Sequence, residues 1–346
     1  MYRKTFAEIN LGAIRHNLEV LNQKFSNYNY RFAVVKADCY GHGLQAIQSM
    51  LDADCNYLAV ATLEEALEVR QLYPKIPILC LGIIPYDGLE IAKSNNITIT
   101  ISNLDYIKNA PNLNGIKTHL KVNTGMNRLG FNDATELTQA YKSLDNVEGI
   151  YTHIYDAENH EHTEAQIQKF QELTSQIPLE KIPIVHIGAS EATLSYQKPD
   201  FANGCRFGIV MYGFYAPEDY NLKSTFALKS EIIQINTLKP GESLGYGGTF
   251  IAEEETKIAV VPIGYADGII RKNKGREVYI NGKAYEIVGN ICMDMLFVKV
   301  DNTAKIGDTV ELLRDKKHIE VTAEYLDTIP YEVLCSVSKR VPRIYQ

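Results

Sequence analysis

Several features that mark other classes of protein are missing from this sequence of 346 residues. The basic residues form no cluster and the net charge is −7, so we expect no nucleic acid and no anionic membrane surface as a partner. No apolar stretch approaches the ~20 residues needed to cross a bilayer. The first eight residues lack the apolar core of a signal peptide. We therefore expect a cytoplasmic protein that is not attached to a membrane.

Closely spaced cysteines are also missing. The six cysteines are Cys39, Cys55, Cys80, Cys205, Cys292 and Cys335. Their wide separation, often within apolar runs, predicts reduced and buried thiols rather than disulfides. No CxxC or HExxH spacing occurs, so the sequence indicates no metal site.

What the sequence does contain is a long alternation of strand-like and helix-like segments. Apolar and charged residues make up 45% and 22% of the chain, which is ordinary for a globular protein. The predicted strands span residues 32–35, 57–61, 77–81, 98–101, 120–123, 149–154, 184–187 and 205–209. Eight such units in roughly 210 residues match a (β/α)8 barrel of the TIM type. The alternative is a doubly wound open sheet. We rank it second because such a sheet seldom contains eight parallel strands.

The pattern of predicted secondary structure changes near residue 223. Short β-rich runs separated by glycine turns follow, and helices are nearly absent, as in a compact all-β domain. We therefore expect an α/β chain with a barrel over residues 10–222 and a C-terminal all-β domain over residues 223–346. Residues 1–9 are expected to pack on this second domain.

Two helix starts can be read from local chemistry. Asn10 precedes a helical pattern and can act as its N-cap. Thr62 and Glu65 have the spacing of a capping box, which predicts a helix through Arg70.

The residues at the strand ends indicate where the chemistry takes place, since barrel enzymes act at the C-terminal ends of their strands. Lys36 ends the first predicted strand and is followed by a turn rich in glycine. A desolvated lysine loses its proton and can form a Schiff base with a carbonyl compound. Most lysines so placed only extend their amine into water. Asn123, His153 and Arg206 stand at or just after other strand ends.

The loops after the seventh and eighth strands suggest a phosphate site, as is usual in such barrels. The segment 188–191, Gly-Ala-Ser-Glu, offers backbone N–H groups and the Ser190 hydroxyl, and Gly208 and Ile209 follow the last strand. The plain alternative is a turn with an N-cap serine. A phosphate cradle on the same rim as Lys36 indicates pyridoxal phosphate (PLP) as the cofactor.

For four side chains, three histidines and a tyrosine, the sequence predicts exposure or a role. His153 is either a packed barrel histidine or a partner that stacks on a cofactor ring. His186 lies within a strand and is interpreted as structural, whereas His42 is expected to be exposed. Tyr246 stands between two glycines, so its phenol is expected to be exposed and available as a proton carrier.

These motifs resemble those of the PLP-dependent alanine racemases, nearly from end to end. The similar segments are Ala-Val-Val-Lys-Ala-Asp-Cys-Tyr-Gly-His-Gly at 33–43, Leu-Lys-Val-Asn-Thr-Gly-Met-Asn-Arg-Leu-Gly at 120–130, Gly-Tyr-Gly at 245–247, Ile-Gly-Tyr-Ala-Asp-Gly at 263–268, Cys-Met-Asp at 292–294, Tyr-Glu-Val-Leu at 331–334 and Arg-Val-Pro-Arg-Ile-Tyr at 340–345.

The resemblance implies a role for each matching residue. Lys36 and Tyr246 are the two bases. The cofactor is held by Lys36, Tyr40, His153, Ser190, Arg206, Gly208, Ile209 and Tyr331. Arg128, Met293 and Tyr265 contact the substrate. The supporting residues are Lys121, which is a carbamate in many relatives, Arg271 and Asp294.

The resemblance also implies the activity and the assembly. The expected reaction is the interconversion of L- and D-alanine, which supplies D-alanine for peptidoglycan. Tyr246, Tyr265 and Met293 would act in the active site of a partner subunit within a homodimer. Arg206 does not readily give up a proton, so it would leave the ring nitrogen of the cofactor unprotonated and disfavour transamination and decarboxylation.

Some positions depart from the family pattern. Asn123 replaces an Asp, Asn127 a Gly, Ala189 an Asn and Asn290 an Arg, and the segment 155–158 is atypical. A racemase that prefers serine or accepts many amino acids is therefore the first alternative. A PLP-dependent decarboxylase is the second, and a non-enzymatic PLP-binding module, which would lack the β domain, is the third.

Overall fold

Eight parallel strands close into a barrel in the computed structural model, which describes residues 2–346. The barrel strands are β2 (Tyr30–Val34), β3 (Tyr57–Val60), β4 (Ile78–Cys80), β5 (Ile97–Ile101), β6 (Thr118–Lys121), β7 (Val147–Tyr151), β8 (Ile184–His186) and β9 (Gly204–Phe207). Strand β9 pairs with β2 and closes the ring. All eight predicted barrel strands are confirmed, and so is the TIM-type fold class.

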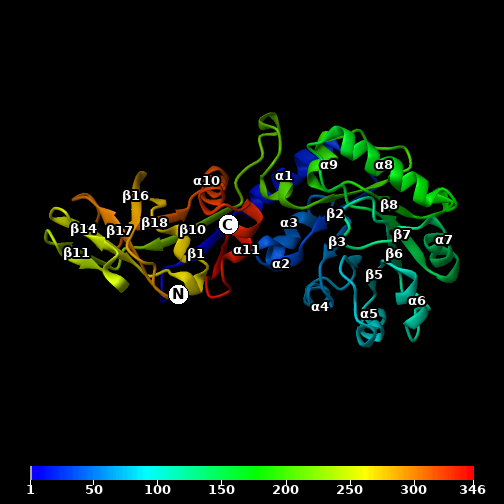
Figure 1. Ribbon diagram of the computed structural model, residues 1–346, viewed down its shortest axis with the longest axis horizontal. Helices are drawn as coiled ribbons and strands as arrows, with labels where there is room; N and C mark the ends of the chain where they lie inside the picture. The colour runs from blue at the N-terminus through cyan, green and yellow to red at the C-terminus, as the bar shows by residue number, and fades with distance from the viewer. Residues whose placement is uncertain (1) are drawn as a thin grey trace.

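Helices cover the outside of this barrel (Figure 1). They are α1 (Leu11–Lys24), α3 (Ile47–Leu51), α4 (Leu63–Leu72), α5 (Leu89–Ser94), α6 (Leu104–Asn109), α7 (Ala134–Ser143), α8 (His160–Thr174) and α9 (Ser190–Ser195). The two predicted helix starts are confirmed. Asn10 Oδ1 accepts a hydrogen bond from the backbone N–H of Ala13 at 2.8 Å, and Thr62 and Glu65 form the capping box. Between residues 2 and 346, no helix has the length and apolar character that crossing a membrane requires.

The second lobe is built on a sheet of nine strands in the order β11-β14-β17-β16-β15-β18-β10-β1-β19. These strands are β1 (Phe6–Ile9), β10 (Phe226–Glu231), β11 (Gln234–Leu238), β14 (Thr256–Val261), β15 (Glu277–Ile280), β16 (Lys283–Val288), β17 (Leu296–Val300), β18 (Thr309–Leu313) and β19 (Arg343–Tyr345). A small hairpin pairs β12 (Ser243–Leu244) with β13 (Phe250–Ile251). The first and last strands of the chain thus lie side by side in this lobe, while Met1 lies outside the described residues.

The sheet lobe also has two helices that the sequence analysis did not expect. They are α10 (Lys316–Leu326) and α11 (Pro330–Ser336). The local signals were present, because Asp315 caps α10 through the N–H of His318 at 2.9 Å and Pro330 occupies the first turn of α11. Helix α11 lies against the barrel rim and places Tyr331 there.

The cysteines follow the predicted pattern in part. Cys39, Cys55, Cys80 and Cys205 are buried free thiols, as expected. Cys292 is half-buried and Cys335 is exposed, so the expectation of burial was wrong for these two. Cys335 lies in α11, on the side of that helix which does not face the core.

Candidate functional site

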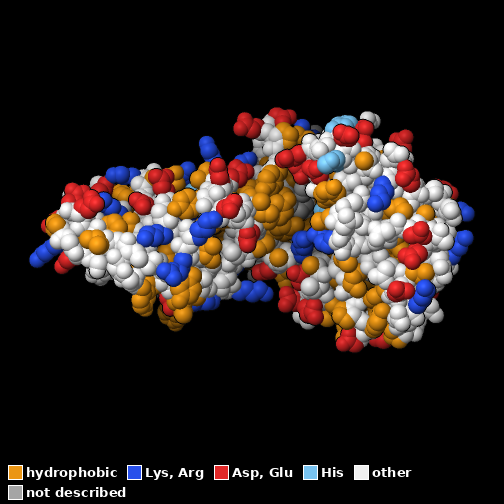
Figure 2. All heavy atoms as spheres, viewed as in Figure 1, with side chains coloured by type: hydrophobic (Ala, Val, Ile, Leu, Met, Phe, Trp, Pro, Cys, Tyr) orange, Lys and Arg blue, Asp and Glu red, His pale blue; other side chains and the backbone are white. Residues whose placement is uncertain are grey.

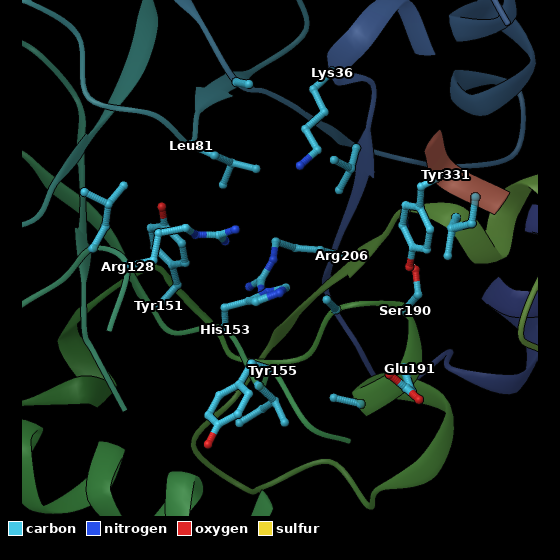
Figure 3. A pocket seen from close by; sticks show the side chains of 18 of the residues that line it. Lys36, Leu81, Arg128, Tyr151, His153, Tyr155, Ser190, Glu191, Arg206 and Tyr331 are labelled. Atoms are coloured by element: carbon cyan, nitrogen blue, oxygen red, sulfur yellow. The ribbon is translucent and has the colours of Figure 1, made fainter. Parts of the chain in front are cut away.

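A cavity of about 430 Å³ opens at the C-terminal ends of the barrel strands (Figure 3). This volume suits a small ligand. The cavity brings together ten of the residues that the sequence singled out: Lys36, Tyr40, Lys121, Arg128, His153, Ser190, Arg206, Gly208, Ile209 and Tyr331. In Figure 3 the amine of Lys36 points into the space in front of Arg206, and the hydroxyl of Tyr331 points toward Ser190.

Lys36 begins a left-handed turn, α2 (Lys36–Tyr40). The four residues after it, 37–40, all have φ between +52° and +55°, although none is a glycine. Such a conformation costs about 1–2 kcal/mol per residue, so the surroundings must hold it. The turn places the side chains of both Lys36 and Tyr40 at the cavity.

Glu65 stabilises this turn from the neighbouring helix. One carboxylate oxygen accepts a hydrogen bond from the N–H of Ala37 at 2.7 Å, and the other accepts from the N–H of Ala61 at 2.7 Å. The same carboxylate completes the capping box with Thr62. The sequence revealed Glu65 as a cap, but its contact with the residue after Lys36 is not local and was missed.

The sequence analysis expected His42, near the end of this turn, to be exposed. That expectation was wrong, because the side chain is fully buried. Gly41 has φ of +79°, and a Cβ there would lie 2.4 Å from the carbonyl oxygen of Leu334 in α11. His42 itself stacks on Tyr212 with 4.1 Å between ring centroids, and its Nε2 lies 2.8 Å from Thr225 Oγ1 in the sheet lobe. Burial lowers the pKa of His42 to about 3, so the ring is neutral.

The cavity is rich in positive charge. Lys36, Lys121, Arg128 and Arg206 all line it. Burial, followed by the charge of Arg128, lowers the pKa of Lys36, which favours the neutral and nucleophilic amine. Burial and the charges of Arg128, Arg206 and Lys36 lower the pKa of Lys121 to about 8. A ligand that carries negative charge fits this cavity best.

An anion cradle lies at one end of the cavity. Ser190 Oγ accepts a hydrogen bond from the N–H of Gly208 at 2.9 Å. A Cβ at Gly208 would lie 3.0 Å from Tyr40 Oη and 3.4 Å from Ser190 Oγ, so only glycine leaves this space open between two hydroxyls. The N-cap of α9 is Ala189, which forms no side-chain cap, so the plain alternative of an N-cap serine is wrong. These groups fit the phosphate of PLP.

Arg206 lies at the opposite side of the cavity and is 3% exposed. Its guanidinium donates to His186 Nδ1 at 2.8 Å and to the carbonyl oxygen of Thr152 at 3.0 Å. Burial lowers the pKa of Arg206 to about 10, which leaves it cationic at neutral pH. His153 Nδ1 lies 3.3 Å from the same guanidinium, and burial together with Arg206 lowers the pKa of His153 to about 3.

The cavity lining also includes Tyr151 and Leu81, which the sequence analysis did not single out, and Tyr155, which belongs to the atypical segment 155–158 (Figure 3). Tyr151 stands two residues before His153 and therefore shares its side of the strand, a signal that alternation along β7 could have given. Nothing local in the sequence marks Leu81, and Tyr155 was marked only by the departure of its segment from the family pattern.

The remaining predicted site residues lie away from the cavity. Tyr246, Tyr265 and Met293 are 75%, 42% and 53% exposed. Arg271 is exposed, and Asp294 forms an ion pair with Arg340 at 2.8 Å. Figure 2 shows hydrophobic side chains gathered on the lower edge of the sheet lobe as drawn. A single chain therefore does not bring Tyr246 to Lys36.

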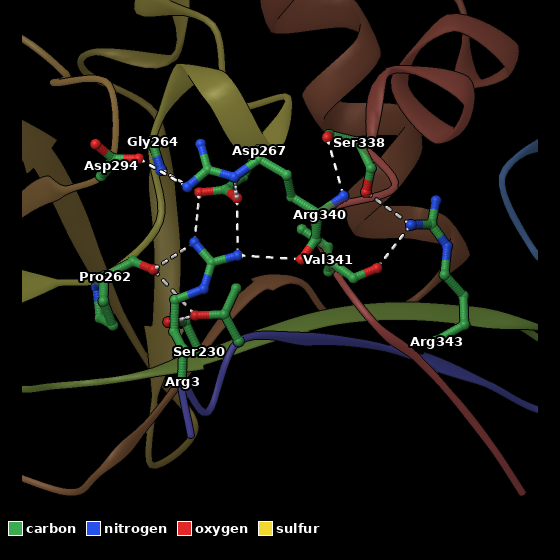
Figure 4. Close-up of polar contacts among 11 residues, drawn as sticks. Arg3, Ser230, Pro262, Gly264, Asp267, Asp294, Ser338, Arg340, Val341 and Arg343 are labelled. Carbon is green, nitrogen blue, oxygen red and sulfur yellow. Dashed lines mark hydrogen bonds and ion pairs between the residues drawn. The ribbon is translucent and has the colours of Figure 1, made fainter. Parts of the chain in front are cut away.

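A polar cluster fixes the turn that presents Tyr265 (Figure 4). Arg3 donates two hydrogen bonds to the buried carboxylate of Asp267, at 2.8 and 2.9 Å. Asp267 in turn accepts from the N–H of Gly264 at 3.1 Å, and the N–H of Tyr265 donates to the carbonyl oxygen of Cys292. The segments that carry Tyr265 and Met293 are thus held together on the surface.

Three of the departures from the family pattern have local partners. Asn290 Nδ2 donates to the carbonyl oxygen of Tyr246 at 2.7 Å and so holds its backbone. Asn123 Nδ2 donates to Asn127 Oδ1 at 3.0 Å, and Asn123 Oδ1 accepts from the N–H of Asn127 at 2.9 Å. The substitutions at 123 and 127 therefore form one interaction.

Taken together, the barrel, the rim lysine, the anion cradle and the sheet lobe define an enzyme that handles a small anionic molecule with an activated amine. Comparisons with known proteins identify the family. Residues 9–216 match the model for the N-terminal domain of alanine racemase, and residues 225–345 match the model for its C-terminal domain. The chain belongs to the alanine racemase family.

Individual relatives agree over the whole length. The chain is 37% identical to alanine racemase 1 of Bacillus subtilis (strain 168), covering 99% of this chain and 93% of that protein. It is 34% identical to the alanine racemase of Streptococcus suis (strain 98HAH33), covering 100% and 99%. The crystal structure of alanine racemase from Bacillus anthracis with bound L-Ala-P superposes with a TM-score of 0.92 at 31% identity, covering 100% and 96%.

The contacts of Glu65 lead to a testable prediction. In the Glu65→Gln variant the amide NH₂ must face a backbone N–H, so one hydrogen bond to the former carboxylate is lost and the free energy of unfolding falls by about 1–2 kcal/mol. Urea unfolding monitored by circular dichroism measures the change. The Glu64→Gln variant is the matched control, because Glu64 is the exposed neighbour in the same helix. Equal unfolding of the two variants would contradict the role of Glu65.

Proposed function

We propose that this chain interconverts L- and D-alanine, using PLP held covalently by Lys36. The observation on which the proposal rests is one cavity that contains a lysine with a lowered pKa and, beside it, an anion cradle. Tyr40, Ser190, Gly208, Ile209 and Tyr331 would hold the phosphate, and His153 and Arg206 would contact the ring. When bound, the cofactor withdraws electrons from the substrate Cα–H bond and so acidifies it.

Two side chains would move the proton. Lys36 Nζ, with its lowered pKa, accepts a proton on one face of the substrate, and Tyr246 Oη acts on the other face. Lys36 would serve the D-antipode and Tyr246 the L-antipode. Racemisation follows because a proton removed on one face is returned on the opposite face.

Arg128 and Lys121 would organise the substrate end of the cavity. Arg128 provides a cation for the substrate carboxylate. A pKa of about 8 leaves part of Lys121 neutral, and a neutral amine combines with carbon dioxide to give a carbamate and a proton. A carbamate on Lys121 would convert a cation beside Arg128 into an anion that can orient its guanidinium.

Arg206 favours racemisation over the other reactions of PLP. A guanidinium whose pKa is about 10 keeps its proton at neutral pH, so it would donate a hydrogen bond to the ring nitrogen without protonating it. An unprotonated ring withdraws electrons less strongly. This choice of residue argues against a decarboxylase, which needs the stronger withdrawal.

The active unit would be a homodimer whose two sites each combine side chains from both subunits. Tyr246 lies in the sheet lobe and is exposed, as are Tyr265, Met293, Met295 and Ile270. Such a group of exposed apolar side chains suits a protein interface. In the cell, the proposed role is to supply D-alanine for peptidoglycan.

The first test concerns covalent attachment of the cofactor. After borohydride reduction, mass spectrometry should find the mass of the cofactor on the peptide that contains Lys36. The Lys121 peptide of the same digest is the control and should lack it. The Lys36→Ala variant should lose both the adduct and racemisation, and an adduct that persists elsewhere in the cavity would refute the assignment.

The second test concerns sharing of the site between subunits. Lys36→Ala and Tyr246→Phe each remove one base, so each variant alone should be nearly inactive. Co-refolded in equal amounts, they should recover about a quarter of the parental activity, because half of the dimers are mixed and each has one intact site. Lys36→Ala refolded with itself is the control. Recovery no greater than in the single variants would contradict a shared site.

The third test concerns the substrate. Chiral chromatography of reactions with L-alanine, L-serine and L-lysine should give a kcat/KM for alanine at least about tenfold above the others, since a small pocket discriminates by size. A higher value for serine or lysine would replace alanine as the substrate. Release of carbon dioxide would indicate a decarboxylase.

A further inference from the structure

A line of polar side chains runs through the barrel interior, away from the cavity. Arg206 donates to His186 Nδ1 at 2.8 Å, and His186 Nε2 lies 2.9 Å from His119 Nδ1. On its far side, His119 Nε2 lies 3.5 Å from the carboxylate of Glu148. Both histidines are completely buried. The line thus joins the cavity to the opposite end of the barrel, where the strands begin.

The backbone is shaped to place Glu148 in this line. The β6–β7 pairing shifts at this point, so that Thr118 faces Val147 and His119 faces Gly149. This bulge leaves Glu148 without a partner across the ladder, and bulges commonly redirect a side chain. Gly149 then makes room for the ring, because a Cβ there would lie 2.5 Å from His119 Cε1.

Aromatic rings fix the middle of the line. His186 stacks between Phe32, at 4.6 Å between centroids, and Tyr151, at 4.7 Å. At the far end, Tyr57 Oη donates to Glu148 at 2.6 Å and Lys117 Nζ donates to it at 2.8 Å. Burial opposes ionisation of Glu148, but hydrogen bonds from His119, Lys117 and Tyr57 bring its pKa below the ordinary value.

The direction of the hydrogen bonds follows from Arg206. An arginine only donates, so His186 Nδ1 must accept and the proton of that neutral ring lies on Nε2. His186 Nε2 therefore donates to His119 Nδ1, and the His119 proton lies on Nε2, facing Glu148. Burial lowers the pKa of both histidines, which keeps them neutral. This arrangement of protons agrees with both hydrogen bonds of His186 and turns the His119 Nε2 proton toward Glu148, 3.5 Å away.

The line also connects the buried cation of Arg206 to an anion. A buried cation is costly unless an anion compensates it. The hydrogen bonds of the Arg206 guanidinium within residues 2–346 end on carbonyl oxygens and imidazole nitrogens. The anion in line with it is Glu148, two imidazoles away.

We propose that Glu148 is a positioning residue that acts through His119 and His186 to fix the protonation pattern around Arg206 and the orientation of its guanidinium. The functional part of this inference rests on the proposed contact of Arg206 with the cofactor ring. The proton pattern stands on the contacts alone, and it can be measured without cofactor.

Nitrogen NMR of protein labelled with ¹⁵N-histidine tests the pattern, with and without PLP. We expect His119 and His186 each to be protonated on Nε2 alone. In the Glu148→Gln variant the His119 Nε2 proton should lose its strongly shifted resonance, because the carboxylate charge is gone. A proton on Nδ1 of His186 in the parent protein would overturn the proposal.

Kinetics test the consequence for catalysis. Glu148→Gln should lower kcat for alanine about tenfold and leave KM within twofold, since the substrate carboxylate contacts other residues. Glu161→Gln is the matched control: it removes the charge of an exposed carboxylate in α8, outside the line, and both constants should stay within twofold. An unchanged kcat in folded Glu148→Gln would refute the positioning role.

A second variant covers the case in which Glu148→Gln does not fold. In His119→Met the thioether sulfur can still accept from His186 but has no hydrogen to donate to Glu148, so the same loss in kcat is expected and an unchanged kcat refutes the role. If the parent protein does not racemise alanine, the proposed function fails, whereas the NMR pattern decides the proton arrangement independently.

Discussion

The left-handed turn after β2 is the constraint on which the rest of the site depends. Four consecutive L-residues, 37–40, adopt a left-handed backbone that few sequences tolerate. Lys36 comes directly before them and Tyr40 is the last of them, and the chemistry needs the side chains of both. The turn brings the amine of Lys36 and the hydroxyl of Tyr40 into one cavity, although they are separated by three residues. Glu65 from α4 and the close backbone of α11 hold it in place. Contacts from both lobes therefore stabilise this one turn.

Charge organises the cavity in a similarly non-local way. Four cations line a space in which the matching anion is a ligand. Burial, and after it the repulsion from neighbouring cations, lowers the pKa of the two lysines. Arg206 is supported from the other side by neutral imidazoles. The barrel interior, which in many such folds is filled with branched aliphatic side chains, here contains Phe32, Tyr57, Tyr151 and the two histidines instead.

The structural features that depend on local sequence patterns or on contiguous motifs could be predicted from the sequence. The eight barrel strands follow from apolar runs, and Lys36 and the cradle at Ser190 follow from their places at strand ends. The left-handed turn could not be predicted, because residues 37–40 contain no glycine. Burial of His42 depends on Tyr212 and Thr225, more than 160 residues away along the chain. The alignment of Glu148 with His119 depends on a bulge that no residue pattern marks.

Strand β1 lies between β10 and β19, with Ala7 beside Arg343 and Ile9 beside Tyr345. The sheet lobe therefore cannot be completed until residues 343–345 have emerged from the ribosome. The barrel, by contrast, is contiguous in sequence and can close while synthesis continues, because domains generally fold as units in the order of their synthesis. During that interval the edge of β1 that later pairs with β19 has no partner strand. The order of translation thus makes the barrel the template on which the sheet lobe is finished.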